Sequence, residues 1–301
     1  MIGLIVPTLN AGSQWSDWIA LLKSQSLQPD RVLVVDSSSD DQTIQLARQA
    51  GFEVLSIQRS DFNHGATRQL AANHLSDAEI LIYLTQDALL ADNNALKYLV
   101  EAFSNPLVGA AYGRQLPHLD AGVLGAHARD FNYGAKSEVR SMKDIPVRGL
   151  KTVFISNSFS AYRKSALMAV GGFPANVILG EDTFVVSKMV LAGWEVAYCA
   201  EAKVRHSHDY TIVQEFKRYF DTGVFHGRET WIRQAMGGAD GEGKRFVLSE
   251  LRCLVRKAPW LIPSALLRTG MKYLGYKLGM MENKIPLSIK RRLSMHKRYW
   301  N

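Results

Sequence analysis

The chain has 301 residues, 47% of them hydrophobic, so it is large and apolar enough for one globular unit or two, and extended disorder is excluded. Its two cysteines, Cys199 and Cys253, cannot form a disulfide framework and lack a metal-binding spacing. The net charge of +8 is concentrated in residues 244–301, which carry 14 lysines and arginines and only two acids, so we expect a mildly acidic body and a basic tail that meets an anionic surface.

The first half of the chain alternates short apolar runs with amphipathic stretches. The apolar runs predict strands, and the stretches between them predict helices. Continuous apolar strands separated by helices are typical of a parallel sheet covered on both faces, so the expected fold class is α/β, with ligands at the carboxyl ends of the strands. The expected strands are 3–6, 31–35, 53–57, 80–84, 108–114, 152–162, 195–198 and 203–205. The expected helices are 15–24, 39–50, 65–75, 164–170, 181–191 and 211–231. A capping box from Ser39 to Gln42 is expected to open the second of these helices.

Polar motifs follow the first two expected strands. The first strand runs into VPTLN and the second into VVDSSSDD, so Asp36 lies at a carboxyl strand end, where its carboxylate could accept a hydrogen bond from a base or a ribose. The alternative is that Asp36, Ser37 and Ser39 only form a turn and a helix cap. No G-x-G-x-x-G follows the first strand, which disfavours a dinucleotide-binding Rossmann domain.

The next two motifs suit a diphosphate and its metal ion. In HGATR, Arg68 lies near the start of an expected helix, where it and the backbone N–H groups after His64 can face a phosphate; a solvated arginine is the alternative. In LTQDA, Asp87 ends a strongly apolar strand. Diphosphate-bound Mg²⁺ or Mn²⁺ needs only one or two carboxylates from a protein, so Asp87 is a candidate ligand, or else the cap of the next segment.

Two later motifs supply candidates for a base and for further metal ligands. In GED, Glu181 and Asp182 open an apolar helix, and only one of them is expected to face a reaction because adjacent helical side chains diverge. We choose Asp182 as general base, with Glu181 as second choice or structural partner; acids that only stabilise a first helical turn are the alternative. In HSH, His206 and His208 face the same way in an extended segment, which suits metal ligands as well as ordinary polar side chains.

The order of these motifs is more specific than any one of them. VPTLN, VVDSSSDD, LTQDA, GED and HSH follow one another over residues 1–232, and in this order they resemble glycosyltransferase family 2, whose members have the GT-A fold. FNHGATRQLAA, YLTQDA and AYGRQLPH are similar to the bacterial rhamnosyltransferase branch, which builds surface polysaccharides from dTDP-rhamnose. The resemblance implies a Rossmann-like, mostly parallel sheet flanked by helices, to which the basic C-terminal helices would be an extension.

The resemblance also implies a part for each motif residue. The family's metal-binding Asp-x-Asp has Thr85 in its first place here, so only Asp87 carries over. The later metal-binding histidine corresponds to His206, with His208 as the alternative, and the catalytic base corresponds to Asp182. The residues implied for nucleotide-sugar binding are Pro7, Thr8, Asn10, Asp36, Arg68, Gln86 and Asp87.

The implied activity is an inverting, metal-dependent sugar transfer with Mg²⁺ or Mn²⁺ as cofactor. The implied donor is dTDP-rhamnose, and the implied acceptor is a hydroxyl of a saccharide or polyprenyl-linked saccharide in the synthesis of O-antigen or a related polysaccharide. Irregular segments beside a rigid sheet usually carry specificity, so residues 117–150 and 173–180 are the expected acceptor walls. The alternatives are a family 2 transferase that uses a UDP-sugar, or an inactive scaffold associated with a membrane or a nucleic acid.

Residues 237–243, GGADGEG, predict a linker between a GT-A catalytic domain at 1–236 and a basic amphipathic helical region at 244–301. Such helices can lie against anionic lipid, pack on the body or form a dimer. We expect no signal peptide, because the first residues lack a basic segment. We also expect no membrane-spanning segment, because the best apolar run is too short to cross a bilayer. A nucleic-acid partner is not expected, because no recognised nucleic-acid-binding motif occurs. The expected location is cytoplasmic, peripheral on the inner face of the cell membrane.

Overall fold

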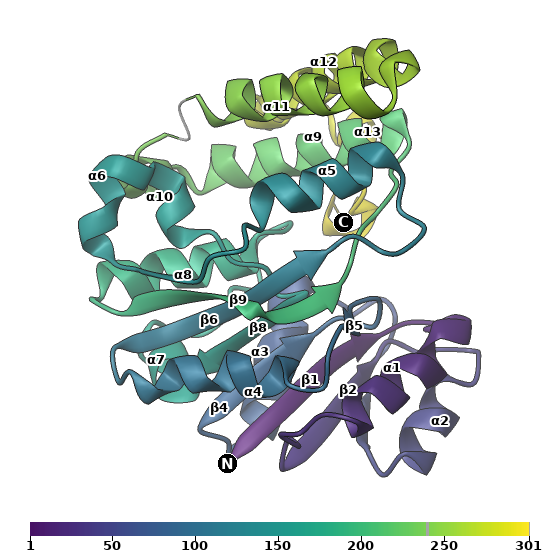
Figure 1. The fold of residues 1–301 in the computed structure, drawn as a ribbon, viewed down its shortest axis with the longest axis vertical. Helices are drawn as coiled ribbons and strands as arrows, with labels where there is room; N and C mark the ends of the chain where they lie inside the picture. The colour runs from purple at the N-terminus through teal and green to yellow at the C-terminus, as the bar shows by residue number, and fades with distance from the viewer. Residues whose placement is uncertain (239–240, 301) are drawn as a thin grey trace.

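The computed structural model describes residues 1–238 and 241–300 and contains a nine-stranded sheet flanked by helices (Figure 1). The strand order is β3-β2-β1-β4-β8-β6-β9-β5, with β7 paired to β9. The first four strands are parallel, whereas β8 runs antiparallel between β4 and β6. The predicted α/β fold is confirmed. The strands are β1 (Ile2–Thr8), β2 (Arg31–Asp36), β3 (Glu53–Ser56), β4 (Ile80–Leu84), β5 (Leu89–Leu90), β6 (Val108–Leu116), β7 (Glu138–Arg140), β8 (Phe159–Arg163) and β9 (Glu195–Arg205).

Helices pack on both faces of the sheet, as strands that are apolar along their whole length require. Helices α1 and α4 contribute to the core on one face, and α3, α8 and α9 contribute to the core on the other. The helices are α1 (Trp15–Lys23), α2 (Thr43–Gln49), α3 (His64–His74), α4 (Ala95–Glu101), α5 (Val123–Asn132), α6 (Ile145–Arg148), α7 (Lys164–Ala169), α8 (Glu181–Leu191), α9 (Ile212–Arg228), α10 (Thr230–Met236), α11 (Glu242–Lys257), α12 (Ile262–Met280) and α13 (Leu287–Leu293).

The second half of the chain departs from the predicted elements in three places. The strand expected at 152–162 begins only at Phe159, because residues 149–153 form a 3-10 helix. The last two expected strands form one strand, β9, whose register against β6 shifts twice. The helix expected at 211–231 is interrupted at Glu229, between α9 and α10. Local periodicity does not reveal such breaks, because they depend on contacts with neighbouring strands and helices.

The capping box predicted from Ser39 to Gln42 is wrong. Helix α2 begins at Thr43, and Gln42 makes no side-chain capping bond. The Ser39 hydroxyl instead donates to the Asp36 carboxylate, with 2.5 Å between the oxygens, and accepts the backbone N–H of Asn10 at 2.8 Å. Ser39 therefore joins the loops that follow β1 and β2, since a hydroxyl can serve a distant loop as well as a helix start.

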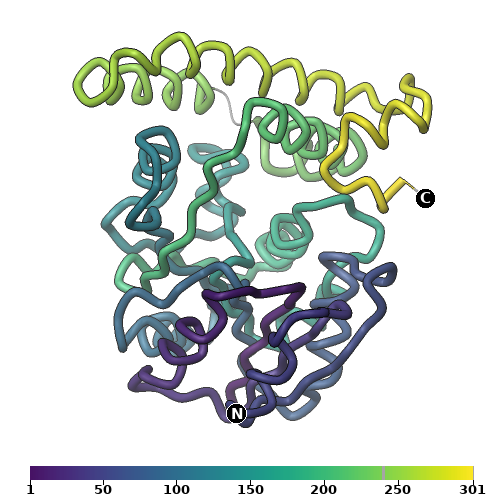
Figure 2. Tube along the Cα trace, turned by 90° about the vertical axis from the view of Figure 1, so that its right-hand side faces the viewer, coloured from purple at the N-terminus to yellow at the C-terminus, as the bar shows by residue number. Residues whose placement is uncertain are grey.

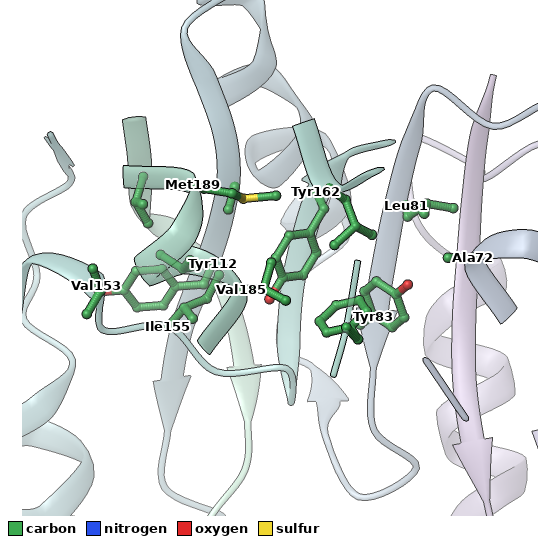
Figure 3. Close-up of a cluster of buried hydrophobic side chains, with 14 of the residues drawn as sticks. Ala72, Leu81, Tyr83, Tyr112, Val153, Ile155, Tyr162, Val185 and Met189 are labelled. Carbon is green, nitrogen blue, oxygen red and sulfur yellow. The ribbon is translucent and has the colours of Figure 1, made fainter. Parts of the chain in front are cut away.

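Alternating side chains of β4 divide the core between the two faces of the sheet. Leu81 and Tyr83 belong to the same buried cluster as Tyr162 of β8 and as Val185 and Met189 of α8 (Figure 3). The Tyr83 and Tyr162 rings meet edge to face, with 5.6 Å between their centroids. This rigid layer lies beneath the start of α8.

The C-terminal helices α11 and α12 cross the end of the molecule opposite the N-terminus (Figures 1 and 2). Helix α12 approaches α9 closely at Gly275 and Gly279, where an added Cβ would lie 2.4 and 2.0 Å from backbone oxygens of α9. The predicted linker includes Ala239 and Asp240, which lie outside the described residues, and α11 begins at Glu242. The division into two domains stays a prediction. Among the described residues, no helix combines the length and hydropathy that crossing a bilayer requires.

Candidate active site

Strand pairing brings Asp87 to the two histidines. Asp87 lies in the turn between β4 and β5, and β5 pairs antiparallel with the end of β9, so that Leu89 faces Arg205. His206 and His208 follow β9 directly and therefore lie beside that turn. The Asp87 Oδ2 atom is 3.5 Å from Nε2 of His206 and 3.6 Å from Nε2 of His208.

Asp87, His206 and His208 form a site that fits a divalent cation. One ligand atom from each residue lies within 4.8 Å of the others, so a single ion could contact all three. Burial opposes ionisation of Asp87, but a hydrogen bond and charge from His206 hold the pKa of its carboxyl well below the usual range. Burial, together with the His206 charge, lowers the pKa of His208 to about 4, so its imidazole is neutral and can donate a lone pair. Two neutral imidazole nitrogens and one carboxylate oxygen can ligate a divalent metal ion.

Gln115 of β6 fixes the orientation of His206. Its Oε1 atom lies 2.9 Å from Nδ1 of His206 and 2.8 Å from Nη1 of Arg129. Because a guanidinium can only donate, the amide atom facing Arg129 must be oxygen, and His206 must then donate from Nδ1. When a cation takes the place of the proton between Nε2 of His206 and Asp87, the Nε2 lone pair is free to bind it, because Gln115 keeps the other ring proton on Nδ1. Sequence reasoning missed Gln115, although a single amide in an apolar strand is a signal worth following.

Asp182 lies at the start of α8, where the preceding Gly180 adopts a left-handed φ of 77°. Its carboxylate accepts the backbone N–H groups of Asn157, at 3.2 Å, and Thr183, at 2.7 Å. Burial and the neighbouring Glu181 charge raise the pKa of Asp182 to about 6. A carboxylate with such a pKa is ionised near neutral pH and still accepts a proton readily, which suits a general base.

Glu181 and Arg68 form a buried ion pair beside Asp182. Their closest oxygen and nitrogen atoms are 3.1 Å apart, and Asn157 Nδ2 also donates to Glu181 at 3.0 Å. Although burial opposes ionisation of Glu181, the Arg68 and His64 charges hold the pKa of its carboxyl below the usual range. Arg68 is thus not the solvated arginine considered as an alternative, and Glu181 is engaged as a structural partner.

The helix N-terminus after His64 does not offer its first N–H groups to an anion, contrary to the sequence expectation. The Asn63 side chain accepts the backbone N–H groups of Gly65 and Ala66, at 3.0 and 2.9 Å. This is an ordinary helix cap, and it uses donors that a phosphate would otherwise approach. Among the described residues, Arg68 Nε is a buried donor without an acceptor, so Arg68 remains the candidate for a phosphate.

The predicted nucleotide-binding residues of the first two strands lie together at the carboxyl ends of β1 and β2. Asp36 is fully buried and accepts hydrogen bonds from the Thr8 hydroxyl at 2.9 Å and from Ser39. Asn10, with a φ of 48°, accepts the Asp40 N–H. Asp36 thus holds the loops together, and its contact with a nucleotide stays a prediction. Pro7 lies in β1 beside Val35 of β2, and Gln86 binds the backbone N–H and carbonyl of Leu9.

One large cavity joins half of the predicted site residues. It has a volume of about 970 Å³. The nucleotide-side residues Pro7, Thr8, Asn10, Asp36 and Gln86 are not in its wall. Helix α5 and the turn before α8 form part of the wall, as the predicted acceptor segments suggest, and α9, α11 and α12 contribute more of it. The predicted residues that line the cavity are Arg68, Asp87, Asp182, His206 and His208.

Comparisons with known proteins agree on the family. The model of glycosyl transferase family 2 matches residues 4–171. The O-antigen chain rhamnosyltransferase RfbN of Salmonella typhimurium strain LT2 is 54% identical over 301 residues, 100% of this chain and 96% of that protein. The O-antigen chain rhamnosyltransferase WbaN of Salmonella anatum is 50% identical over 99% of this chain and 95% of that protein.

Two groups of solved structures share the fold at low identity. The mannosyltransferase PcManGT from Pyrobaculum calidifontis, in complex with GDP-Man and Mn²⁺, has a TM-score of 0.57 and 18% identity, over 99% of this chain and 84% of that one. TarS 1-349 of S. aureus in complex with UDP-GlcNAc has a TM-score of 0.54 and 14% identity, over 94% and 91%. These structures confirm the predicted GT-A type fold. The family model and the two relatives, which match nearly the whole chain, show that the chain belongs to glycosyl transferase family 2 and is a glycosyltransferase.

Proposed function

We propose that the protein transfers L-rhamnose from dTDP-rhamnose to a hydroxyl of a saccharide or lipid-linked saccharide in O-antigen synthesis. The observation that carries the proposal is that Asp182 lines the same cavity as Asp87, His206 and His208, so that a base and a metal site share one space. Two relatives with at least 50% identity over nearly the whole chain are named O-antigen chain rhamnosyltransferases, which supports the donor and argues against an inactive scaffold.

Asp182 acts as the general base in this proposal. Its carboxylate removes the proton of the acceptor hydroxyl while that oxygen forms a bond to the anomeric carbon and the bond from this carbon to the diphosphate oxygen breaks. Because the acceptor attacks opposite the leaving group, one displacement inverts the anomeric configuration. The backbone N–H groups of Asn157 and Thr183 keep the Asp182 carboxylate oriented, so little ordering is required when the acceptor binds.

Asp87, His206 and His208 hold the divalent cation in this proposal, with Mn²⁺ preferred over Mg²⁺ by the two imidazoles. When bound, the cation stabilises the negative charge that develops on the leaving diphosphate. Gln115 keeps Nε2 of His206 available as a ligand, and Arg68 supplies a buried positive charge in the same cavity. Mn²⁺ in the PcManGT complex, a protein of the same fold, agrees with this preference.

A thermal-shift series tests the donor. We expect dTDP-rhamnose and dTDP with Mn²⁺ to raise the melting temperature more than the UDP and GDP counterparts, because at one concentration the ligand that binds the folded state more tightly stabilises it more. The test uses the full chain at one ligand concentration and includes each nucleotide without metal. Selective stabilisation by UDP forms would instead support the UDP-sugar alternative.

Peripheral contact with an anionic membrane is also part of the proposal. The outer face of α12 carries exposed apolar side chains at helical spacing, among them Leu266, Leu267 and Tyr273. Trp260, just before α12, is 73% exposed. Arg252 and Arg256 of the adjoining α11 are exposed as well, so apolar and cationic side chains occur on the same pair of helices. Such a combination is suited to the interface of an anionic bilayer.

Flotation with liposomes tests the membrane contact. We expect the full chain to float with phosphatidylglycerol-containing vesicles and Leu267→Ser to weaken this binding by about tenfold or more, because a leucine side chain contributes about 1.5 kcal/mol or more when removed from water. Leu107→Ser is the matched control, since both leucines are 55% exposed and Leu107 lies outside the C-terminal helices. Equal binding by all three proteins, or indifference to anionic lipid, would contradict the contact.

A further inference from the structure

The inner faces of the C-terminal helices line the cavity. Phe246 and Glu250 project from α11, and Arg268 and Lys272 project from α12, opposite residues of α5 and α9. These residues lie beyond the segment that the family model matches, and none belongs to the motifs predicted to bind the nucleotide or the metal. Helices α11 and α12, which we propose to contact a membrane, therefore also form one wall of the cavity that contains Asp182.

Glu250 is the unusual group in this wall. It is only 4% exposed, and among the described residues it has neither a hydrogen bond nor an ion pair. The neighbouring cations Arg268 and Lys272 are engaged elsewhere, since both pair with Glu215, at 3.1 and 3.3 Å. Burial raises the pKa of Glu250, although the Lys272 charge opposes the shift. A buried carboxylate without a protein partner is costly, and one that lines a cavity is suited to accept hydrogen bonds from a ligand.

The surroundings of Glu250 are aromatic as well as polar. The Phe246 ring contacts the edge of Phe131, with 5.1 Å between the centroids, and the Lys272 ammonium lies 5.6 Å from the centre of Phe246. A hydrogen bond of 2.9 Å between Ser249 and His127 ties α11 to α5 and holds this wall in place. A saccharide has apolar C–H faces that pack on aromatic rings and hydroxyl groups that donate to carboxylates, so its chemistry matches this wall.

We infer that Glu250 and Phe246 form a binding subsite for the acceptor saccharide. Glu250 accepts hydrogen bonds from sugar hydroxyls, and Phe246 contacts an apolar face of the sugar ring. The subsite lies on α11, outside the β1–β4 region where the nucleotide-binding motifs occur, so it serves the acceptor rather than the donor. This assignment rests on the proposed function, and it adds the C-terminal helices to the acceptor walls predicted from residues 117–150 and 173–180.

Kinetics of Glu250 variants test the subsite. The donor is dTDP-rhamnose, and the acceptor probe is the lipid extract of membranes from a Salmonella typhimurium LT2 strain that lacks RfbN. We expect Glu250→Leu to raise the half-saturating acceptor concentration by about tenfold or more, because hydrogen bonds to a charged group are lost. Glu250→Gln, which keeps one acceptor oxygen, shows a smaller rise. The half-saturating donor concentration and the thermal shift by dTDP with Mn²⁺ stay as in the wild type.

The control is Glu101→Leu, which removes an exposed carboxylate from α4, outside the cavity wall. It should leave both half-saturating concentrations unchanged. If the Glu250 variants are active and their half-saturating acceptor concentration equals that of the wild type, the subsite is overturned but the proposed function is not. An equal rise in the half-saturating concentrations of donor and acceptor also overturns the subsite, because it indicates a general structural effect. Wild-type protein that transfers nothing to the extract overturns the proposed function itself. If Glu250→Leu does not fold, Glu250→Gln decides the outcome by the same readout.

Discussion

Asp182→Asn is expected to lower turnover by about a thousandfold, because a positioned general base contributes about 10²–10⁴-fold and an amide cannot accept the acceptor's proton. Nucleotide binding should persist, since Asp182 contacts backbone N–H groups of the protein and is not among the residues predicted to bind the nucleotide. Initial rates of rhamnose transfer, together with the thermal shift produced by dTDP and Mn²⁺, measure the two effects separately.

The pH dependence gives a second readout for the same residue. Burial and Glu181 raise the pKa of Asp182 to about 6, and the base acts only as the carboxylate. Wild-type activity should therefore rise as the pH increases through about 6 and fall when Asp182 becomes protonated below it. The residual activity of Asp182→Asn should lack this rise.

The matched control is Asp17→Asn, which changes an exposed carboxylate on α1 and should leave turnover and its pH profile unchanged. Near-normal turnover of Asp182→Asn would remove Asp182 from the role of base. In that case Glu181 would not be an attractive substitute, because its carboxylate is committed to Arg68 and Asn157.

Removal of the divalent cation is expected to abolish transfer. EDTA-treated protein should lose at least about 99% of its activity, since charge stabilisation of the leaving group by a metal is worth several kcal/mol, and Mn²⁺ should restore the rate more fully than Mg²⁺. Asp87→Ala should prevent this recovery, because it removes the only carboxylate of the predicted site. Mn²⁺ binding measured by electron paramagnetic resonance gives a readout that does not depend on activity.

Gln115 variants test the predicted metal site without changing Asp87, His206 or His208. Gln115→Leu should weaken Mn²⁺ binding by about 10- to 100-fold, because His206 loses the acceptor that fixes its tautomer. Gln115→Glu still accepts from His206 and Arg129, so it should retain most of the affinity. Full activity of thoroughly demetallated protein would contradict the metal site, whereas unchanged Mn²⁺ affinity in Gln115→Leu would contradict only the positioning role.

The nearly correct prediction of β1, β2, β3 and β4 has a physical cause. Strands β1, β2 and β4 are largely buried and contain long apolar runs, whereas the edge strand β3 is only partly buried and has just Val54 and Leu55 as apolar residues. Polar or glycine-containing segments mark where each run ends. The strand expected at 152–162 begins late because Thr152, Val153 and Ile155 are buried like strand residues, although they lie in a 3-10 helix and the loop that follows it. Hydrophobicity reports burial, and it does not by itself distinguish a buried strand from a buried turn.

The α/β class, the family and the residue types of the candidate site follow from the amino-acid sequence alone, because they depend on local periodicity and on the order of short motifs. Which side chains meet is a property of the folded chain. Pairing of β5 with β9 brings Asp87 to His206, a buried ion pair commits Glu181 to Arg68, and α11 brings Glu250 to the cavity. Such contacts join positions far apart in the chain, and their strength comes from burial and hydrogen-bond geometry, which no local pattern of residues contains.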